Sequence, residues 1–276
     1  MYKLAMKCFE KRLGSARRRE KTIWPKAMEE ETLTGDASTK VFNEAPVFMK
    51  ESLTFPYSYG MEFVIKLLRA GGKQKAFAAL LKDPPHTTRQ IMQPETYLSG
   101  EKIEPMPVVE FKRDFPGYTK FDIGAMGEFD VAVLIEQYAD KPESKKLCPE
   151  WRGGYYFAVK SKTDSAAPLG LLYVSRWSSD EAAQEFAGLY AHSLKQRYKK
   201  ADEEGNSEST EASTPASASP DNPTSAPLRG RHAWTTDEGA VVIEAHGDTV
   251  LASESLDATT TMALEREVFG SASPAK

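Results

Sequence analysis

One internal stretch of the chain, residues 201–227, contains nothing that a hydrophobic core could bury. Its sequence, ADEEGNSESTEASTPASASPDNPTSAP, has no Val, Ile, Leu, Met or aromatic residue, and its six acidic residues stand without a basic one. A segment of this composition cannot offset the entropy of ordering its backbone and is typical of flexible acidic linkers. We therefore predict a disordered insertion at 201–230 with structured regions on either side of it.

Positive charge is concentrated at the start of the sequence. Residues 1–26 hold nine Lys or Arg against two Glu, a local charge of +7 in a chain whose net charge is −4. Such an arm can bind nucleic acid or a membrane surface, but no aromatic residues alternate with Arg17, Arg18 and Arg19 as a base-stacking platform requires. We predict a frayed, solvated helix over this basic leader and expect no nucleic-acid partner.

Composition limits the class of protein. Hydrophobic residues make up 40% of the 276 residues, which is enough for a real core. The two cysteines, Cys8 and Cys148, cannot form a disulfide framework or complete a thiolate zinc site. No apolar run approaches the roughly 20 residues of a membrane span, and the first residues lack the apolar stretch of a signal peptide. The sequence therefore predicts a soluble protein, with the cytoplasm as the literal interpretation.

Residues 27–140 are predicted to be mainly helical. The run at 61–68 is apolar on nearly every side, as in a helix buried in a protein interior, and Gly71-Gly72 is expected to end it. The other expected elements are a helix over 75–81, a short helical turn begun by a capping box of Thr87 and Gln90, a short strand at 108–111 and a helix at 127–139.

Residues 150–200 and 231–270 are predicted to form a single α+β domain interrupted by the acidic insertion. The expected elements are a hairpin of strands 155–159 and 169–177, a long helix begun by Ser178 and Glu181, strands 232–236, 240–245 and 249–253, and a last helix that packs Met262, Leu264, Val268 and Phe269. Strand pairs followed by helices, twice over, predict an antiparallel sheet with helices on one face. The fold class is therefore α+β, with a helical N-terminal region.

The sequence contains none of the common catalytic, metal-binding or nucleotide-binding motifs. The four histidines, His86, His192, His232 and His246, stand at no metal-ligand spacing, and the sequence contains no HExxH, CxxC, GxGxxG or GxSxG. Nothing pairs Cys148 with a histidine, so a catalytic thiol is weakly supported. We assign no catalytic residue, no metal ligand and no cofactor from the residues themselves.

Several stretches nevertheless follow one another in a recognisable order. They are residues 34–38 (TGDAS), 57–64 (YSYGMEFV), Gly71-Gly72, 84–91 (PPHTTRQI), 94–97 (PETY), 151–156 (WRGGYY) and the helix from Trp177 to Phe186. In this order they resemble a group of poorly characterised bacterial proteins that are similar to gluzincin-type zinc metallopeptidases. In that group an HExxH helix precedes a helix bearing Glu-Gly-Asp-Ala. The resemblance covers most of residues 28–200 and extends to 231–270.

The departures from that pattern bear on function. A gluzincin site needs two histidines one helical turn apart, a glutamate between them and a carboxylate ligand on a later helix. This sequence begins too late to include the HExxH, and Thr34 stands where the resemblance implies the third ligand. Two independent losses favour an inactive relative, with zinc expected only if an HExxH segment comes from elsewhere.

Three hypotheses follow. The first, which we favour, is a non-catalytic metallopeptidase-like protein that keeps a groove for a polypeptide or a protein partner. The wall of a vestigial cleft would then include Thr34, Asp36, Tyr59, His86 and Arg89, which ordinary capping and loop packing would also explain. The second is an active zinc peptidase whose HExxH lies upstream in the reading frame. The third is an interaction module that dimerises through its C-terminal sheet. The family's relatives tend to be exported, so the resemblance implies export although this sequence shows no signal for it.

Overall fold

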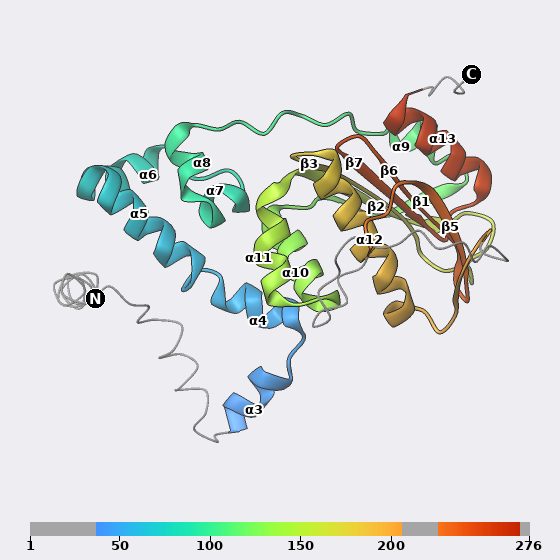
Figure 1. Cartoon of the computed structure of the whole chain (residues 1–276), viewed down its shortest axis with the longest axis horizontal. Helices are drawn as coiled ribbons and strands as arrows, with labels where there is room; N and C mark the ends of the chain where they lie inside the picture. Colours follow the sequence, from blue (N-terminus) through green and yellow to red (C-terminus); the bar gives the residue numbers. More distant parts are fainter. Residues whose placement is uncertain (1–36, 206–225, 271–276) are drawn as a thin grey trace. The chain divides into compact units, whose positions relative to one another are not determined.

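The C-terminal part of the chain is organised around one antiparallel sheet. The computed structural model describes residues 37–205 and 226–270. Its sheet has seven strands in the order β1-β2-β3-β7-β6-β5-β4, and every pair of neighbours is antiparallel (Figure 1). The strands are β1 (Tyr118–Ala125), β2 (Trp151–Ser161), β3 (Gly170–Trp177), β4 (Ala201–Glu203), β5 (Gly230–Thr236), β6 (Gly239–His246) and β7 (Thr249–Glu254). The predicted α+β class, the β2–β3 hairpin and the three later strands are confirmed.

The helices lie against both faces of this sheet. Leu172 and Val174 of β3 belong to the same buried cluster as Leu264 of α13 (Ala258–Phe269). Tyr173, which lies between them and therefore points to the opposite face, has its ring 6.0 Å from that of Phe186 on α12 (Asp180–Arg197). The prediction that all helices cover one face is thus wrong, because β2, β3 and β7 are apolar on both sides.

Strand β1 lies inside the region predicted to be mainly helical. It pairs with β2 from Tyr118 opposite Ser161 to Ala125 opposite Tyr155. Its residues are mostly exposed, so the sequence offers no alternation of buried apolar side chains there. The strand predicted at 108–111 is wrong, since Phe111 begins the short helix α9 (Phe111–Asp114) and Val108 is 60% exposed. The boundary predicted at 140 therefore does not separate the helices from the sheet.

The acidic insertion is ordered at both ends. Its first residues form β4, in which Asp202 pairs with Thr235 of β5. At its other end the amide of Leu228 donates to the carbonyl of Gln184 on α12 at 2.9 Å. The prediction of disorder is thus wrong for 201–205 and 226–230, where backbone pairing supplies what side-chain burial does not. The rest of the insertion and the basic leader 1–26 lie outside the described residues.

The N-terminal part of the described chain is helical, as predicted. Its elements are α3 (Ala37–Glu44), α4 (Val47–Thr54), α5 (Tyr59–Lys73), the π-helix η1 (Gln74–Ala79), α6 (Leu80–Lys82), α7 (Thr88–Met92) and α8 (Pro94–Ser99). The chain divides into two compact units, Met1–Glu62 and Phe63–Lys276. The backbone leaves helical geometry at Gly71 and Gly72, and Gly72 has a φ of 64° that favours glycine, so the predicted end of the apolar helix is confirmed.

The remaining helices lead into or out of the sheet. They are α10 (Glu128–Tyr138), α11 (Lys141–Leu147) and the 3₁₀ turn η2 (Cys148–Glu150). The long helix α12 is capped by Ser179, which accepts from the amide of Ala182, one residue later than predicted. In α13 the predicted packing holds for Leu264, which is fully buried, and is wrong for Met262, which is 47% exposed.

Candidate functional site

The predicted cleft residues do not form one site among the described residues. Thr34 and Asp36 lie outside the described part of the chain. Tyr59 begins α5 in the first compact unit, where its ring lies 5.4 Å from that of Phe55. His86 is exposed and its Nε2 lies 3.6 Å from a carboxylate oxygen of Asp83. Only Arg89 lies in a dense polar cluster, and it is buried there.

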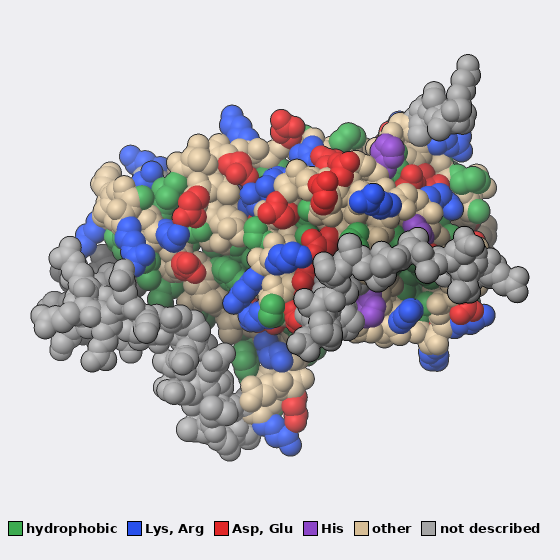
Figure 2. Space-filling view, in the orientation of Figure 1, with side chains coloured by type: hydrophobic (Ala, Val, Ile, Leu, Met, Phe, Trp, Pro, Cys, Tyr) green, Lys and Arg blue, Asp and Glu red, His purple; other side chains and the backbone are tan. Residues whose placement is uncertain are grey.

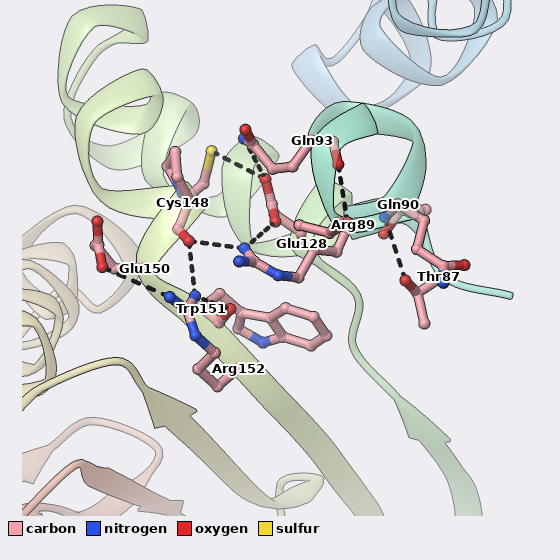
Figure 3. Close-up of polar contacts among 12 residues, drawn as sticks. Thr87, Arg89, Gln90, Gln93, Glu128, Cys148, Glu150, Trp151 and Arg152 are labelled. Carbon is pink, nitrogen blue, oxygen red and sulfur yellow. Dashed lines mark hydrogen bonds and ion pairs between the residues drawn. The ribbon is translucent and has the colours of Figure 1, made fainter. Parts of the chain in front are cut away.

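Arg89 is positioned by the short helix α7. Thr87 caps this helix by accepting from the amide of Gln90 at 3.3 Å, which confirms the predicted start. The Gln90 side chain accepts in turn from the amide of His86 at 2.7 Å, so both residues of the sequence motif fix the loop before the helix. From the second position of α7 the Arg89 guanidinium points toward the N-terminus of α10 (Figure 3).

The partner of Arg89 at that terminus is Glu128, the first residue of α10. Glu128 is completely buried, and Arg89 Nη1 donates to its Oε2 at 3.0 Å. The other carboxylate oxygen accepts from Gln93 at 3.0 Å. Burial raises the pKa of Glu128 despite the opposing effects of the Gln93 hydrogen bond and the Arg89 charge. A carboxylate at a helix N-terminus is also favoured by the exposed backbone amides there.

The cluster extends to the start of β2. Arg89 and Arg152 each donate to the carbonyl of Pro149, at 2.7 and 2.8 Å, so two guanidinium groups meet at one oxygen. Burial and the neighbouring Arg89 lower the pKa of Arg152. Glu101 accepts from Arg89 Nε at 2.9 Å, and Glu150 accepts from Ser178. The cluster thus ties α7, α10 and the entry to β2 together through hydrogen bonds.

Cys148 is the one cysteine among the described residues, and it lies against this cluster. Its Sγ is 4.0 Å from Glu128 Oε1, and the residue is buried (Figure 3). Burial, reinforced by the charge of Glu128, raises the pKa of the Cys148 thiol to about 12. Since the thiolate is the nucleophile, the environment suppresses the reactivity of this sulfur.

We expect Cys148 to react very slowly with a disulfide reagent while the chain is folded. The rise in pKa from 9.0 to about 12 lowers the thiolate fraction about 10³-fold, and burial restricts access further. A Cys8→Ser variant leaves Cys148 as the sole thiol, and its absorbance time course with Ellman's reagent gives the rate. The same variant in urea is the control and reacts at the rate of an exposed thiol. Equal rates in native buffer and in urea would contradict the structure.

A second buried polar cluster joins α12 to β7. Glu254 is 4% exposed, and its carboxylate accepts hydrogen bonds from both terminal nitrogens of Arg197, at 2.8 and 3.1 Å. Tyr190 and Tyr198 also donate their hydroxyls to the same carboxylate. The guanidinium carbon of Arg197 lies 4.9 Å from the centre of the Tyr190 ring. A bidentate arginine with two phenols saturates the carboxylate and fixes the helix on the sheet.

These tyrosines predict a loss of stability at alkaline pH. Burial and then the Glu254 charge raise the pKa of both Tyr190 and Tyr198 above the usual 10. The folded chain therefore holds these protons more tightly than the unfolded chain, and its stability falls as pH rises above about 10. Absorbance at about 295 nm should show their ionisation only together with unfolding. Replacing both by Phe should flatten this pH dependence. Because exposed tyrosines such as Tyr57 also titrate near pH 10, the comparison is with the Tyr190→Phe/Tyr198→Phe variant. If the folded variant showed less titration near pH 10 than the folded wild type, these two tyrosines would ionise without unfolding and the prediction would be refuted.

The sequence could not have identified either cluster as a whole. Arg89 stood out only through the family resemblance, while Glu128 lies 39 residues further on and Glu254 lies 57 residues beyond Arg197. The single local signal is an acidic residue directly before an apolar helical run, which marks Glu128 as a helix N-terminal residue.

Comparison with models of protein families, with curated proteins and with solved structures yields no match to this chain. Within residues 37–205 and 226–270, no three His, Cys, Asp or Glu side chains are grouped so that they could hold a metal ion. Over the same residues, no helix has both the length and the apolar character needed to cross a membrane.

Proposed function

We propose that this chain is a non-catalytic, metallopeptidase-like protein that binds a polypeptide partner. The proposal rests on one observation, a set of exposed apolar side chains on α3, α4 and the turn after them. Val41 is 71% exposed, Met49 51%, Leu53 60% and Tyr57 57%. Single exposed apolar residues are ordinary, but a concentration of them within so short a segment is typical of a protein-binding surface.

The local structure supports the same conclusion. Helix α4 spans only eight residues and contains no buried residue. Helices this short are marginal in water and gain most of their stability by packing an apolar face against something else. The charges beside them are balanced, since Lys40 lies 3.9 Å from Glu44 and each is largely exposed. A partner that covers the apolar side chains would therefore bury hydrophobic surface without stranding a net charge.

The two buried polar clusters also fit a protein without chemistry of its own. Glu128 and Glu254 are both held by an arginine and by neutral donors. A catalytic carboxylate needs access to a substrate proton or atom, and these two face only the protein interior. With Thr34 at the position where the resemblance implies a zinc ligand, we assign the clusters to structure and the apolar helices to binding.

A peptide selection tests the proposal. The full chain is immobilised and a random displayed peptide library is selected on it, and the recovered peptides are measured by isothermal titration. We expect a Met49→Glu/Leu53→Glu variant to bind them at least about tenfold more weakly, because two apolar contacts are replaced by charges. The matched control is Val108→Glu/Phe121→Glu, which changes two apolar residues that are 60% and 57% exposed elsewhere. Equal losses in both variants would overturn the proposed site.

Zinc measurements test the non-catalytic part. The chain is purified without chelators, and zinc is counted by mass spectrometry beside a peptide-hydrolysis assay. We expect zinc far below one ion per chain and no hydrolysis that a chelator abolishes. Stoichiometric zinc with chelator-sensitive hydrolysis would instead support the active peptidase.

A further inference from the structure

The helical segment of residues 63–82 carries a concentration of positive charge. Residues 63–82 contain five Lys or Arg and no Asp or Glu. With the total at −4, the rest of the chain sums to −9. This separation of charge gives α5, η1 and α6 a sign opposite to that of the remainder of the protein.

The same segment carries buried apolar side chains, while Arg69 and Lys82 are exposed and Lys75 is partly exposed. Phe63, Leu67 and Ala76 form its buried cluster. The backbone leaves helical geometry at Gly71 and Gly72, and Lys75 lies against Gly71, where an added Cβ would be 2.8 Å from the Cβ of Lys75. Arg69 precedes this turn, and Lys82 ends α6. Lys and Arg side chains are visible on the surface around α5 and α6 in Figure 2. We call residues 69–82 the basic tip.

Most of this charge has no acidic partner among residues 37–205 and 226–270. Lys66, outside the basic tip, is paired with Glu95 at 2.7 Å. Arg69, Lys75 and Lys82, by contrast, have no acidic partner within the part of the chain that the structure describes. Unpaired cations on one short segment give it a positive local potential, which attracts an anionic surface.

An exposed aliphatic side chain lies among these cations. Leu81 is 86% exposed, the highest value among the exposed large hydrophobic residues. Its neighbour Phe77 is packed against the buried cluster, so the basic tip has no exposed aromatic ring on which a base could stack. Basic side chains around an exposed aliphatic one are the composition of segments that rest on an anionic lipid surface.

We propose that the basic tip binds the surface of an anionic lipid bilayer, with Arg69, Lys75 and Lys82 at the headgroups and Leu81 inserted between them. This site is separate from the apolar helices α3 and α4, and either can fail without the other. Each cation contributes about fivefold to partitioning, so binding falls steeply as salt is added.

Vesicle sedimentation of the full chain tests this inference. We expect the chain to sediment with vesicles of phosphatidylcholine and phosphatidylglycerol at low salt and to stay in solution with phosphatidylcholine alone. An Arg69→Glu/Lys82→Glu variant should bind at least about 25-fold more weakly, about fivefold for each lost cation. A Leu81→Ser variant should lose several-fold in binding with little change in salt dependence.

The matched control is Lys145→Glu/Lys195→Glu, which alters the net charge equally at exposed positions on α11 and α12. Circular dichroism confirms that each variant is folded. Equal binding by Arg69→Glu/Lys82→Glu and the wild type, or an equal loss in the control variant, would overturn the inference. So would retention of single-stranded RNA in place of vesicles, since this would identify the basic tip as a nucleic-acid surface.

Discussion

Replacing Arg89 by Met is expected to destabilise the chain by about 3–5 kcal/mol. The substitution keeps the apolar stem but leaves the Glu128 carboxylate, which is fully buried, without its cation. It also removes the donor to Glu101 and one of the two donors to the carbonyl of Pro149. Urea unfolding followed by tryptophan fluorescence measures the loss in free energy of unfolding.

Two further variants decide whether the buried charge is the cause. In Arg89→Met/Glu128→Leu both charges are gone, so at least half of the lost stability should return. Lys200→Met is the surface control, because Lys200 and its partner Asp202 are 62% and 65% exposed, and it should cost at most about 1 kcal/mol. A double variant no more stable than Arg89→Met would contradict this explanation.

Replacing Glu254 by Leu is expected to have a comparable effect, again about 3–5 kcal/mol, because it strands the Arg197 charge and the buried Tyr190 hydroxyl. Unfolding in urea measures it. Adding Arg197→Met should recover part of the loss, whereas Tyr198→Phe alone removes one hydrogen bond to a charge and should cost about 1.5–3 kcal/mol. If Glu254→Leu were as mild as Tyr198→Phe, the cluster would not anchor α12 to β7.

The sheet could be predicted where its strands carry a clear hydrophobic signal. Strands β2 and β3 are bounded by glycine and polar turns, and β5, β6 and β7 are separated by Gly-containing turns. Strand β1 could not be predicted, because an edge strand that exposes Lys120 and Phe121 has no apolar alternation to detect. Pairing with β2 defines it, and that is a contact across some 30 to 40 residues of sequence.

Only the local contacts of the candidate site could be predicted from the sequence, because its other contacts join residues that are far apart in the chain. The cap that Thr87 provides for α7 acts over three residues, so sequence spacing reveals it. The predicted capping box is not completed, because Gln90 accepts from the amide of His86 and not from that of Thr87. The role of Arg89 depends on Glu128 and Pro149, which the fold brings to it from distant positions. The sequence therefore indicated an arginine in a polar turn, and the structure instead gives a buried cross-link.

The exposed apolar side chains were equally hidden from sequence reasoning. Met49 and Leu53 lie one helical turn apart, a spacing that usually indicates a core-facing stripe. Only the absence of any buried residue in α4 shows that this stripe is uncovered. We therefore propose that these residues, and not the cleft predicted around His86 and Arg89, bind the peptide.

Hydrogen exchange with a bound peptide tests that claim most directly. The full chain is labelled with deuterium alone and with a peptide recovered from the library selection, and protection is mapped by mass spectrometry. We predict that peptide-dependent protection is concentrated in residues 40–58, which include Val41, Met49, Leu53 and Tyr57. Protection confined to residues 84–101, around His86 and Arg89, with none in 40–58, would contradict it.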